Sequence, residues 1–252
     1  MAAAAEAEAR RIQSVLVLIA MAAEAAPFVE RLGLAPAPSL LPGPLPCAVF
    51  AGQHSGLTVT VVTCGACPLF GVDSVGTVPA ALAAYAACAA LQPDLVLSAG
   101  TAGGFVARGG AVGDVYVSTA LRNHDRRIQI PGFDVYGVGE LPCPGGAALA
   151  AALGLKLGVV SSGNSLNCGA EELEELHAAG VHAKEMEAAA VGHVARLFGV
   201  PCLAVKAVTD LVDGGRPTAE EFGENLATAA AALQEALPRV IAFVANKTLA
   251  EL

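Results

Sequence analysis

Tryptophan is absent from this sequence, and positive charge is scarce. The 252 residues include 14 lysines and arginines against 23 aspartates and glutamates, which gives a formal net charge of −9. Basic residues form no run, and the densest groups are two pairs, Arg10 with Arg11 and Arg126 with Arg127. Polyanion binding requires a clustered basic surface. We therefore expect no nucleic-acid partner, and a neutral small molecule fits the charge better than a phosphorylated one.

Long uninterrupted apolar runs are also missing. The apolar segment 78–91 is shorter than the roughly 20 residues that a membrane-spanning helix needs. Residues 1–10 alternate alanine and glutamate, unlike an acid-poor transit peptide or a signal peptide with a basic start. The sequence therefore predicts no membrane partner, a cytoplasmic location and a flexible N-terminal segment over residues 1–13.

Cysteine motifs for metal or redox chemistry are incomplete. The seven cysteines are an odd number scattered through apolar runs, which is typical of free thiols in a reducing compartment. Cys64 and Cys67 have the spacing of half a zinc site or of a redox pair, but no second pair completes a tetrahedral site. A redox motif opens a helix, whereas Pro68 and Gly71 indicate a loop here. We expect no metal and no cofactor.

Apolar runs alternate with helix-like segments along the chain, which is the pattern of a layered α/β domain. Strands are predicted at 14–21, 47–51, 57–64, 95–99, 114–118, 157–162 and 202–208. Helices are predicted at 24–32, 72–91, 170–179, 188–198 and 218–246. Proline and glycine indicate loops at 35–46 and 123–146. No repeat or Gly/Ser linker divides the sequence, so we expect one domain over residues 14–252.

Candidate site residues lie in four segments, three of which follow a predicted strand. Ligands of parallel α/β sheets bind beyond the carboxyl ends of strands, which here means segments 20–24, 98–105, 184–187 and 206–213. An acidic side chain at the end of a buried strand is costly unless it is solvated, paired or protonated. Asp210, at the end of a very apolar run, is therefore the strongest single candidate for a functional acid.

The other three segments each have a structural alternative. Glu24 opens a helix, where the helix dipole favours a carboxylate without any function. The glycine-rich turn at 98–105 offers the Thr101 hydroxyl, but it lacks a dinucleotide fingerprint or a P-loop lysine. In segment 184–187, a carboxylate suits a ribose diol and a methionine suits the sugar face. The same segment also fits an ordinary charged helix start.

Seven stretches, in order along nearly the whole chain, match one family pattern. They are VLIAMAAEAAP from Val17, GVDSVGTVPA from Gly71, SAGTAGGF from Ser98, GDVYVS from Gly113, HDRRIQIPGFDVYGVG from His124, KEMEAAAV from Lys184 and KAVTDLVDGGRPTAEEF from Lys206. VTDLVDG with PTAEEF, preceded by MEAAAV, is the specific combination. The sequence resembles the nucleoside phosphorylase and nucleosidase superfamily, and within it the plant and algal methylthioadenosine nucleosidases.

The resemblance implies a fold and a reaction. The fold would be a three-layer α/β/α phosphorylase/hydrolase-like domain with a central twisted mixed sheet. The reaction would be hydrolysis of the N-glycosidic bond of 5′-methylthioadenosine to adenine and 5-methylthioribose, as in methionine salvage. Action on S-adenosylhomocysteine would be weaker, because we place no basic residue where its charged tail would lie. In this family pattern Asp210 matches the acid that protonates adenine N7, and Glu24 matches the carboxylate that activates water.

The resemblance also implies the binding residues. Glu187 matches the acceptor of the ribose hydroxyls, Met186 packs against the sugar, and Leu166 covers the adenine. The remaining expected substrate contacts are Thr101, Ala102, Gly103, Lys184, Glu185 and Thr209. A homodimer is expected, in which loop 133–139 closes the pocket of the neighbouring subunit. Two features depart from the family pattern: Asn164 replaces an aspartate, and loop 63–70 lacks an expected arginine.

Two other functions fit the same sequence. A phosphorylase of this fold would use phosphate in place of water, but it would need arginines to hold the dianion. Neither 20–24 nor 98–101 contains an arginine. A non-catalytic nucleoside-binding protein would have no reason to keep both Glu24 and Asp210.

Overall fold

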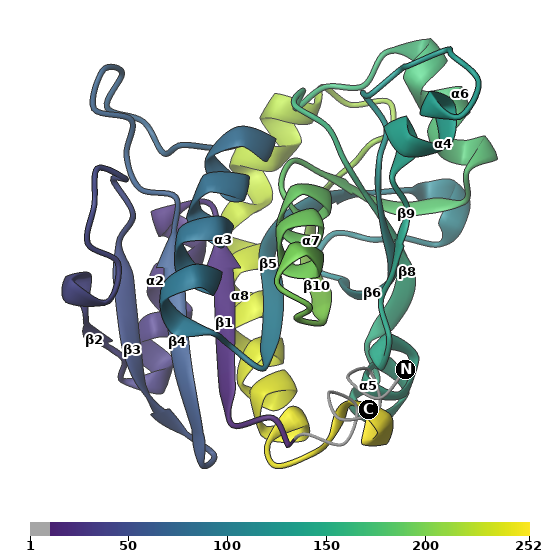
Figure 1. The fold of residues 1–252 in the computed structure, drawn as a ribbon. Helices are drawn as coiled ribbons and strands as arrows, with labels where there is room; N and C mark the ends of the chain where they lie inside the picture. The colour runs from purple at the N-terminus through teal and green to yellow at the C-terminus, as the bar shows by residue number, and fades with distance from the viewer. Residues whose placement is uncertain (1–10) are drawn as a thin grey trace.

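The computed structural model describes residues 11–252 (Figure 1). Of the predicted flexible segment 1–13, residues 1–10 lie outside the described residues. Arg11 forms a β-bridge with Thr248 and donates a hydrogen bond to the carbonyl of Asn246 at 2.5 Å. Ile12 is buried. The start of the described chain is therefore held against the segment that follows α8.

A twisted mixed sheet lies at the centre of the described chain, as the family pattern implied. It contains ten strands, in the order β10-β6-β8-β9-β5-β1-β4-β3-β2, with β7 beside β6. Strand β10 also pairs with β5, so β5, β10, β6, β8 and β9 form a closed ring, which the sequence did not predict. The strands are β1 Ser14–Ile19, β2 Ala35–Pro36, β3 Val49–His54, β4 Leu57–Thr63, β5 Leu95–Gly104, β6 Val115–Asn123, β7 Leu141–Pro142, β8 Lys156–Ser162, β9 Val181–Glu185 and β10 Cys202–Leu211.

Helices cover both faces of this sheet. Helices α3 and α7 pack together on one face, and α2 packs against α8 on the other (Figure 1). This arrangement gives the three layers that we expected. The helices are α2 Ala22–Leu32, α3 Thr77–Leu91, α4 Phe133–Val138, α5 Gly146–Leu153, α6 Ala170–Ala178, α7 Ala188–Leu197 and α8 Thr218–Val244.

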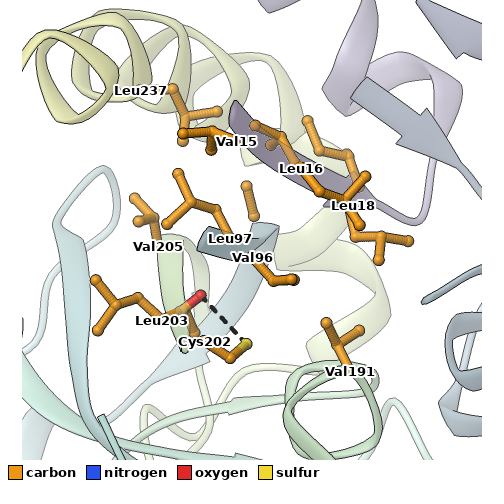
Figure 2. Packing of buried hydrophobic residues seen from close by; sticks show 14 of the residues in the cluster. Val15, Leu16, Leu18, Val96, Leu97, Val191, Cys202, Leu203, Val205 and Leu237 are labelled. Atoms are coloured by element: carbon orange, nitrogen blue, oxygen red, sulfur yellow. Dashed lines mark hydrogen bonds between the residues drawn. The ribbon is translucent and has the colours of Figure 1, made fainter. Parts of the chain in front are cut away.

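The central strands are apolar along their whole length because both of their faces are covered. Val15, Leu97 and Val205 come from the neighbouring strands β1, β5 and β10, and all three are buried. Figure 2 shows these side chains between Leu237 of α8 and Val191 of α7. Each fully buried side chain of this kind contributes about 1.5–3 kcal/mol. The packing fixes the strand ends that carry the site.

Several predicted boundaries were wrong in ways that bear on the site. The turn predicted after residue 99 continues as strand β5, whose Gly103 pairs with Lys184 of β9. Strand β9 itself was missed, because its residues alternate polar and apolar over only five positions. Helix α3 begins at Thr77 rather than residue 72, since Gly76 precedes it with a φ of 98°. Helix α4 lies within the segment predicted as a loop, and helix α5, which begins at the last residue of that segment, was not predicted.

Helix α8 contradicts the expectation that no segment is long and apolar enough to cross a membrane. By length and composition it passes that test, over Thr218–Val244. Its apolar residues Leu233, Leu237, Val240 and Val244 are completely buried, and the helix packs against β10 and β5. One apolar stripe facing a sheet is the pattern of a core helix.

Candidate active site

A cavity of about 670 Å³ lies at the carboxyl ends of β1, β5, β9 and β10. It is lined by every residue that the sequence proposed for the site: Glu24, Thr101, Ala102, Gly103, Leu166, Lys184, Glu185, Met186, Glu187, Thr209 and Asp210. Further lining residues had been given no role: Ala20, Met21, Ala66, Gly71, Val72, Asp73, Val75, Ser165, Val212 and Phe222. Most of these lie inside the matched stretches, so position within a matched stretch was the signal that could have identified them.

Glu24 is fixed on three sides. Its Oε1 atom accepts hydrogen bonds from the Thr101 amide at 2.8 Å and from the Thr101 hydroxyl at 2.5 Å. Its Oε2 atom accepts from the Met21 amide at 3.4 Å, so the carboxylate also caps the start of its own helix. Gly100 permits this approach, because a Cβ there would lie 3.3 Å from Oε2. The structural role and the site role of Glu24 are therefore compatible.

The Asp210 side chain points into the cavity because strand β10 is irregular just before it. The register with β5 shifts between Val208 and Asp210, which makes Thr209 an extra residue in the ladder. Neighbouring side chains of a regular strand point to opposite faces, but Thr209 and Asp210 both line the cavity. The Thr209 hydroxyl donates to Oδ1 of Asp210 at 2.7 Å. A Cβ at Gly103 would lie 2.8 Å from Oδ2, so only glycine fits beside the acid.

The surroundings of Asp210 favour its protonated form. Burial is the main cause that raises the pKa of Asp210 above its usual value, and the negative charge of Glu221 raises it further. The hydrogen bond from Thr209 and the charge of Lys184 act in the opposite direction. A carboxylic acid that keeps its proton closer to neutral pH suits general-acid catalysis.

Glu185 is committed to the protein scaffold. Its Oε2 atom lies 2.8 Å from Nζ of Lys206, and both side chains are almost completely buried. It also accepts hydrogen bonds from the Ser162 hydroxyl and from the amides of Glu187 and Ala188. Burial opposes its charge, but Lys206 and these hydrogen bonds hold the pKa of Glu185 below its usual value. Although Glu185 lines the cavity, its carboxylate anchors the start of α7.

Glu187 lies two residues further on and has different surroundings. Its Oε1 atom accepts one hydrogen bond, from the Gly76 amide at 2.8 Å. Burial, followed by the charge of Glu185, raises the pKa of Glu187 to about 7. Glu185 therefore stabilises the fold, whereas the Glu187 carboxylate faces the cavity beside Met186.

Lys184 holds the loop that carries Leu166. Its Nζ atom donates to the carbonyls of Ser165 at 2.5 Å and Leu166 at 3.2 Å, and it lies 3.7 Å from Oε1 of Glu172. The ammonium group is therefore already bonded within the protein, and the Lys184 side chain is buried. Lys184 therefore positions one wall of the cavity.

Asn164, which departs from the family pattern, is fully bonded. Its Oδ1 atom accepts from the Thr77 amide and hydroxyl, both at 2.9 Å, at the start of α3. Its Nδ2 atom donates to Oδ2 of Asp125 at 2.9 Å. An aspartate at this position would lose the side-chain donor to Asp125 and would place two carboxylates side by side, so an asparagine is favoured beside Asp125.

The cysteine motif lies in a loop after β4, as predicted. Cys64 and Cys67 are free, and burial is the main cause that raises the pKa of the Cys64 thiol to about 12. A reactive cysteine needs the opposite shift. Within residues 11–252, no group of three or more His, Cys, Asp or Glu side chains has the arrangement of a metal site.

The electrostatic character of the cavity is negative. Among its lining residues in the described chain, five are acidic and one is basic: Glu24, Asp73, Glu185, Glu187 and Asp210 against Lys184. Lys206 pairs with Glu185, and burial favours the protonated form of Asp210. The negative charge therefore comes mainly from Glu24, Asp73 and Glu187. Asp73 contacts the start of α2, since its Oδ2 atom accepts a hydrogen bond from the Ala22 amide at 3.2 Å. A positively charged centre would be stabilised here, whereas an added anion would be repelled.

Comparison with known proteins identifies the family of this chain. The model of the phosphorylase superfamily matches residues 14–242. A 5′-methylthioadenosine/S-adenosylhomocysteine nucleosidase of Arabidopsis thaliana is 43% identical over 97% of each chain. A 5′-methylthioadenosine nucleosidase of the same organism is 44% identical over 96% of this chain and 91% of that protein. The apo structure of an A. thaliana 5′-methylthioadenosine nucleosidase has a TM-score of 0.93 at 44% identity, covering 96% of this chain and 100% of that chain. The chain belongs to the phosphorylase superfamily, in the family of the methylthioadenosine nucleosidases.

Proposed function

We propose that this protein hydrolyses the N-glycosidic bond of 5′-methylthioadenosine to adenine and 5-methylthioribose. The observation that carries the proposal is the meeting of Glu24 and Asp210 in one cavity. Asp210 has a pKa raised by burial, and Glu24, just beyond the carboxyl end of β1, is held by the Thr101 amide. When two carboxyl groups have different surroundings, their pKa values differ, and one can act as the acid while the other acts as the base.

Asp210 acts on the leaving group. Adenine leaves poorly as an anion, so the bond between C1′ and N9 breaks readily only if the base gains a proton. The Asp210 carboxyl group donates that proton to N7 as the bond breaks, and the electron pair of the bond goes to the base. Adenine then leaves as a neutral molecule, and positive charge develops at C1′.

Glu24 acts on the nucleophile. It orients a water molecule and accepts one of its protons while the water oxygen bonds to C1′. The product is 5-methylthioribose, and return of the proton from Glu24 to Asp210 through solvent restores the enzyme. Glu187 accepts hydrogen bonds from the ribose hydroxyls, Met186 packs against the sugar, and Leu166 covers the base. The carboxylates around the cavity also stabilise the positive charge at C1′.

Charge favours water over phosphate as the nucleophile. A phosphate dianion would lie close to Glu24 and would be repelled by about 1–4 kcal/mol per charge pair at about 4 Å, depending on the effective dielectric constant. Lys184, the basic lining residue, is already bonded to two carbonyls and lies beside Glu172. S-adenosylhomocysteine carries a zwitterionic amino-acid tail. The only basic lining residue in the described chain, Lys184, is already bonded and leaves the carboxylate of that tail without a cation, so we propose weaker action on that nucleoside.

Adenine release in phosphate-free buffer is the experiment that tests this function. We expect adenine and free 5-methylthioribose from 5′-methylthioadenosine, and a lower kcat/KM for S-adenosylhomocysteine. Strict dependence on added phosphate, with 5-methylthioribose 1-phosphate as the product, would establish a phosphorylase instead. Binding of the nucleoside without turnover would establish a non-catalytic binding protein. Equal kcat/KM values for the two nucleosides would contradict the proposed preference.

We also propose that two copies of the chain pair through the face of α3. Val78, Leu82 and Tyr85 lie on one stripe of this helix and are more than half exposed. A hollow of about 410 Å³ lies beside them, between α3, α7 and the segment 123–126 that leads to α4. Exposed apolar patches of this kind mark protein interfaces. In the dimer, segment 133–139, which was predicted as a loop and contains α4, would reach the partner's cavity.

Sedimentation velocity tests the dimer. We expect a dimer for the wild type, and a monomer with lower kcat/KM for the double variant Leu82→Glu with Tyr85→Glu. A wild type that sediments as a monomer with full activity would contradict the proposed assembly.

A further inference from the structure

Strand β10 loses its neighbour just before the acid. On the side opposite β5, β6 pairs with β10 as far as Ala207. The residues just before β6 extend this contact to Val208, whose amide donates to the Asp114 carbonyl at 2.9 Å and whose carbonyl accepts from the Gly113 amide at 2.9 Å. The next backbone groups on β10 are bonded by side chains of α8. Nδ2 of Asn225 donates to the Thr209 carbonyl at 3.0 Å, and Oε2 of Glu221 accepts from the Leu211 amide at 3.1 Å.

These two bonds enclose Asp210. The Thr209 carbonyl belongs to the peptide group before the acid, and the Leu211 amide belongs to the peptide group after it. Glu221 and Asn225 are four residues apart and therefore lie on one face of α8. Phe222, between them in the sequence, lines the cavity, so this part of the helix is fixed against the site.

We propose that Glu221 and Asn225 are positioning residues for Asp210, which clamp its two flanking peptide groups and so aim its carboxyl group at the bound nucleobase. This inference rests on the proposed function. Its physical basis is the bulge at Thr209, which turns Asp210 into the cavity but interrupts the ladder with β5. The ladder with β5 resumes at Asp210 and Leu211, but β6 no longer pairs on the opposite side, where the α8 side chains bond the backbone groups instead. A displacement of about 1 Å can cost about 10²-fold in rate.

The two clamp residues differ in charge, which separates two effects. Asn225 supplies a hydrogen bond alone. Glu221 is buried and ionisable, with Nη1 of Arg216 at 3.6 Å from its Oε1 atom. The charged groups that act on Asp210 are Glu221 from α8, which raises its pKa, and Lys184 from β9, which lowers it. Removing the charge of Glu221 therefore lowers the pKa of Asp210, and its proton is lost at lower pH.

Two substrates make the test specific to leaving-group protonation. The first is 5′-methylthioadenosine, which needs the acid, and the second is the 4-nitrophenyl glycoside of 5-methylthioribose, whose leaving group departs as a stable anion. Asn225→Ala should lower kcat for the nucleoside about 10-fold, through misplacement of the acid, with little change in KM. Turnover of the nitrophenyl glycoside should stay at the wild-type level.

Glu221→Gln keeps an acceptor for the Leu211 amide and removes the charge. We expect a kcat near the wild-type value at acidic pH, and a fall in kcat that begins at lower pH than in the wild type. Glu220→Gln is the matched control, because it removes the same charge from an exposed position on the same turn and should leave the pH profile unchanged. If Asn225→Ala does not fold, Asn225→Ser and Glu221→Gln still test the clamp.

Equal losses on both substrates would overturn the proposal, because they would indicate a general structural fault. Wild-type kinetics and an unchanged pH profile in the Asn225 and Glu221 variants would also overturn it. Asp210→Asn, measured alongside, distinguishes this failure from failure of the proposed function. An active wild type with an impaired Asp210→Asn supports the function whatever the clamp variants do. A wild type that releases no adenine would overturn both.

Discussion

Replacing Asp210 with asparagine is expected to lower kcat for 5′-methylthioadenosine by about 10²–10⁴-fold, the usual contribution of a general acid. Asparagine has the same shape, and its carbonyl can still accept the hydrogen bond from the Thr209 hydroxyl. The amide cannot deliver a proton to N7. Steady-state kinetics and a thermal unfolding curve of the purified variant would measure the two properties, and we expect an unfolding temperature close to that of the wild type.

The pH profile gives a second measurement of the same residue. Activity requires the protonated carboxyl group, so kcat of the wild type should fall as the pH rises through the pKa of Asp210. Burial raises this pKa, which extends activity to higher pH than an ordinary aspartate would allow. Asp210→Asn should lack this fall. A folded Asp210→Asn protein with near-wild-type turnover would exclude Asp210 as the acid.

The sequence predicted the parts of the fold that depend on local pattern. Strands β1, β4 and β10 were predicted because each is a run rich in apolar and β-branched residues, which is typical of strands that are mostly buried. Strand β9 was missed because its five residues, VHAKE, contain no such run. It is held by pairing with β5 and β8, and pairing partners far apart in the sequence leave no local signal.

The site was predictable in its membership but not in its geometry. Residue types that follow strands, together with the family resemblance, identified Glu24, Asp210 and Glu187 as lining residues. Nothing local distinguishes Glu185 from Glu187, and only the distant Lys206 shows that the first is a scaffold carboxylate. The bulge at Thr209 was equally hidden, because it is a property of the register between two strands.

Replacing Glu24 with glutamine is expected to lower kcat for 5′-methylthioadenosine by about 10²–10⁴-fold, because the general base is lost. The Gln carbonyl can still accept from the Thr101 amide and hydroxyl, and of the bonds in the described chain only the long 3.4 Å one from the Met21 amide to Oε2 is lost, so α2 should keep its position. Circular dichroism of the variant should match the wild type. Glu30→Gln, an exposed carboxylate of the same helix, is the matched control and should retain wild-type kinetics.

The Asp210 and Glu24 variants should differ in their activity on the 4-nitrophenyl glycoside, whose leaving group needs no proton. Asp210→Asn should hydrolyse the 4-nitrophenyl glycoside at close to the wild-type rate, whereas Glu24→Gln should be impaired on both substrates because each requires water to be activated. Added phosphate should not restore Glu24→Gln, since the other lining carboxylates still repel the anion. Full activity of Glu24→Gln on the nitrophenyl glycoside, with a loss confined to the nucleoside, would assign Glu24 to the leaving group and reverse the proposed roles.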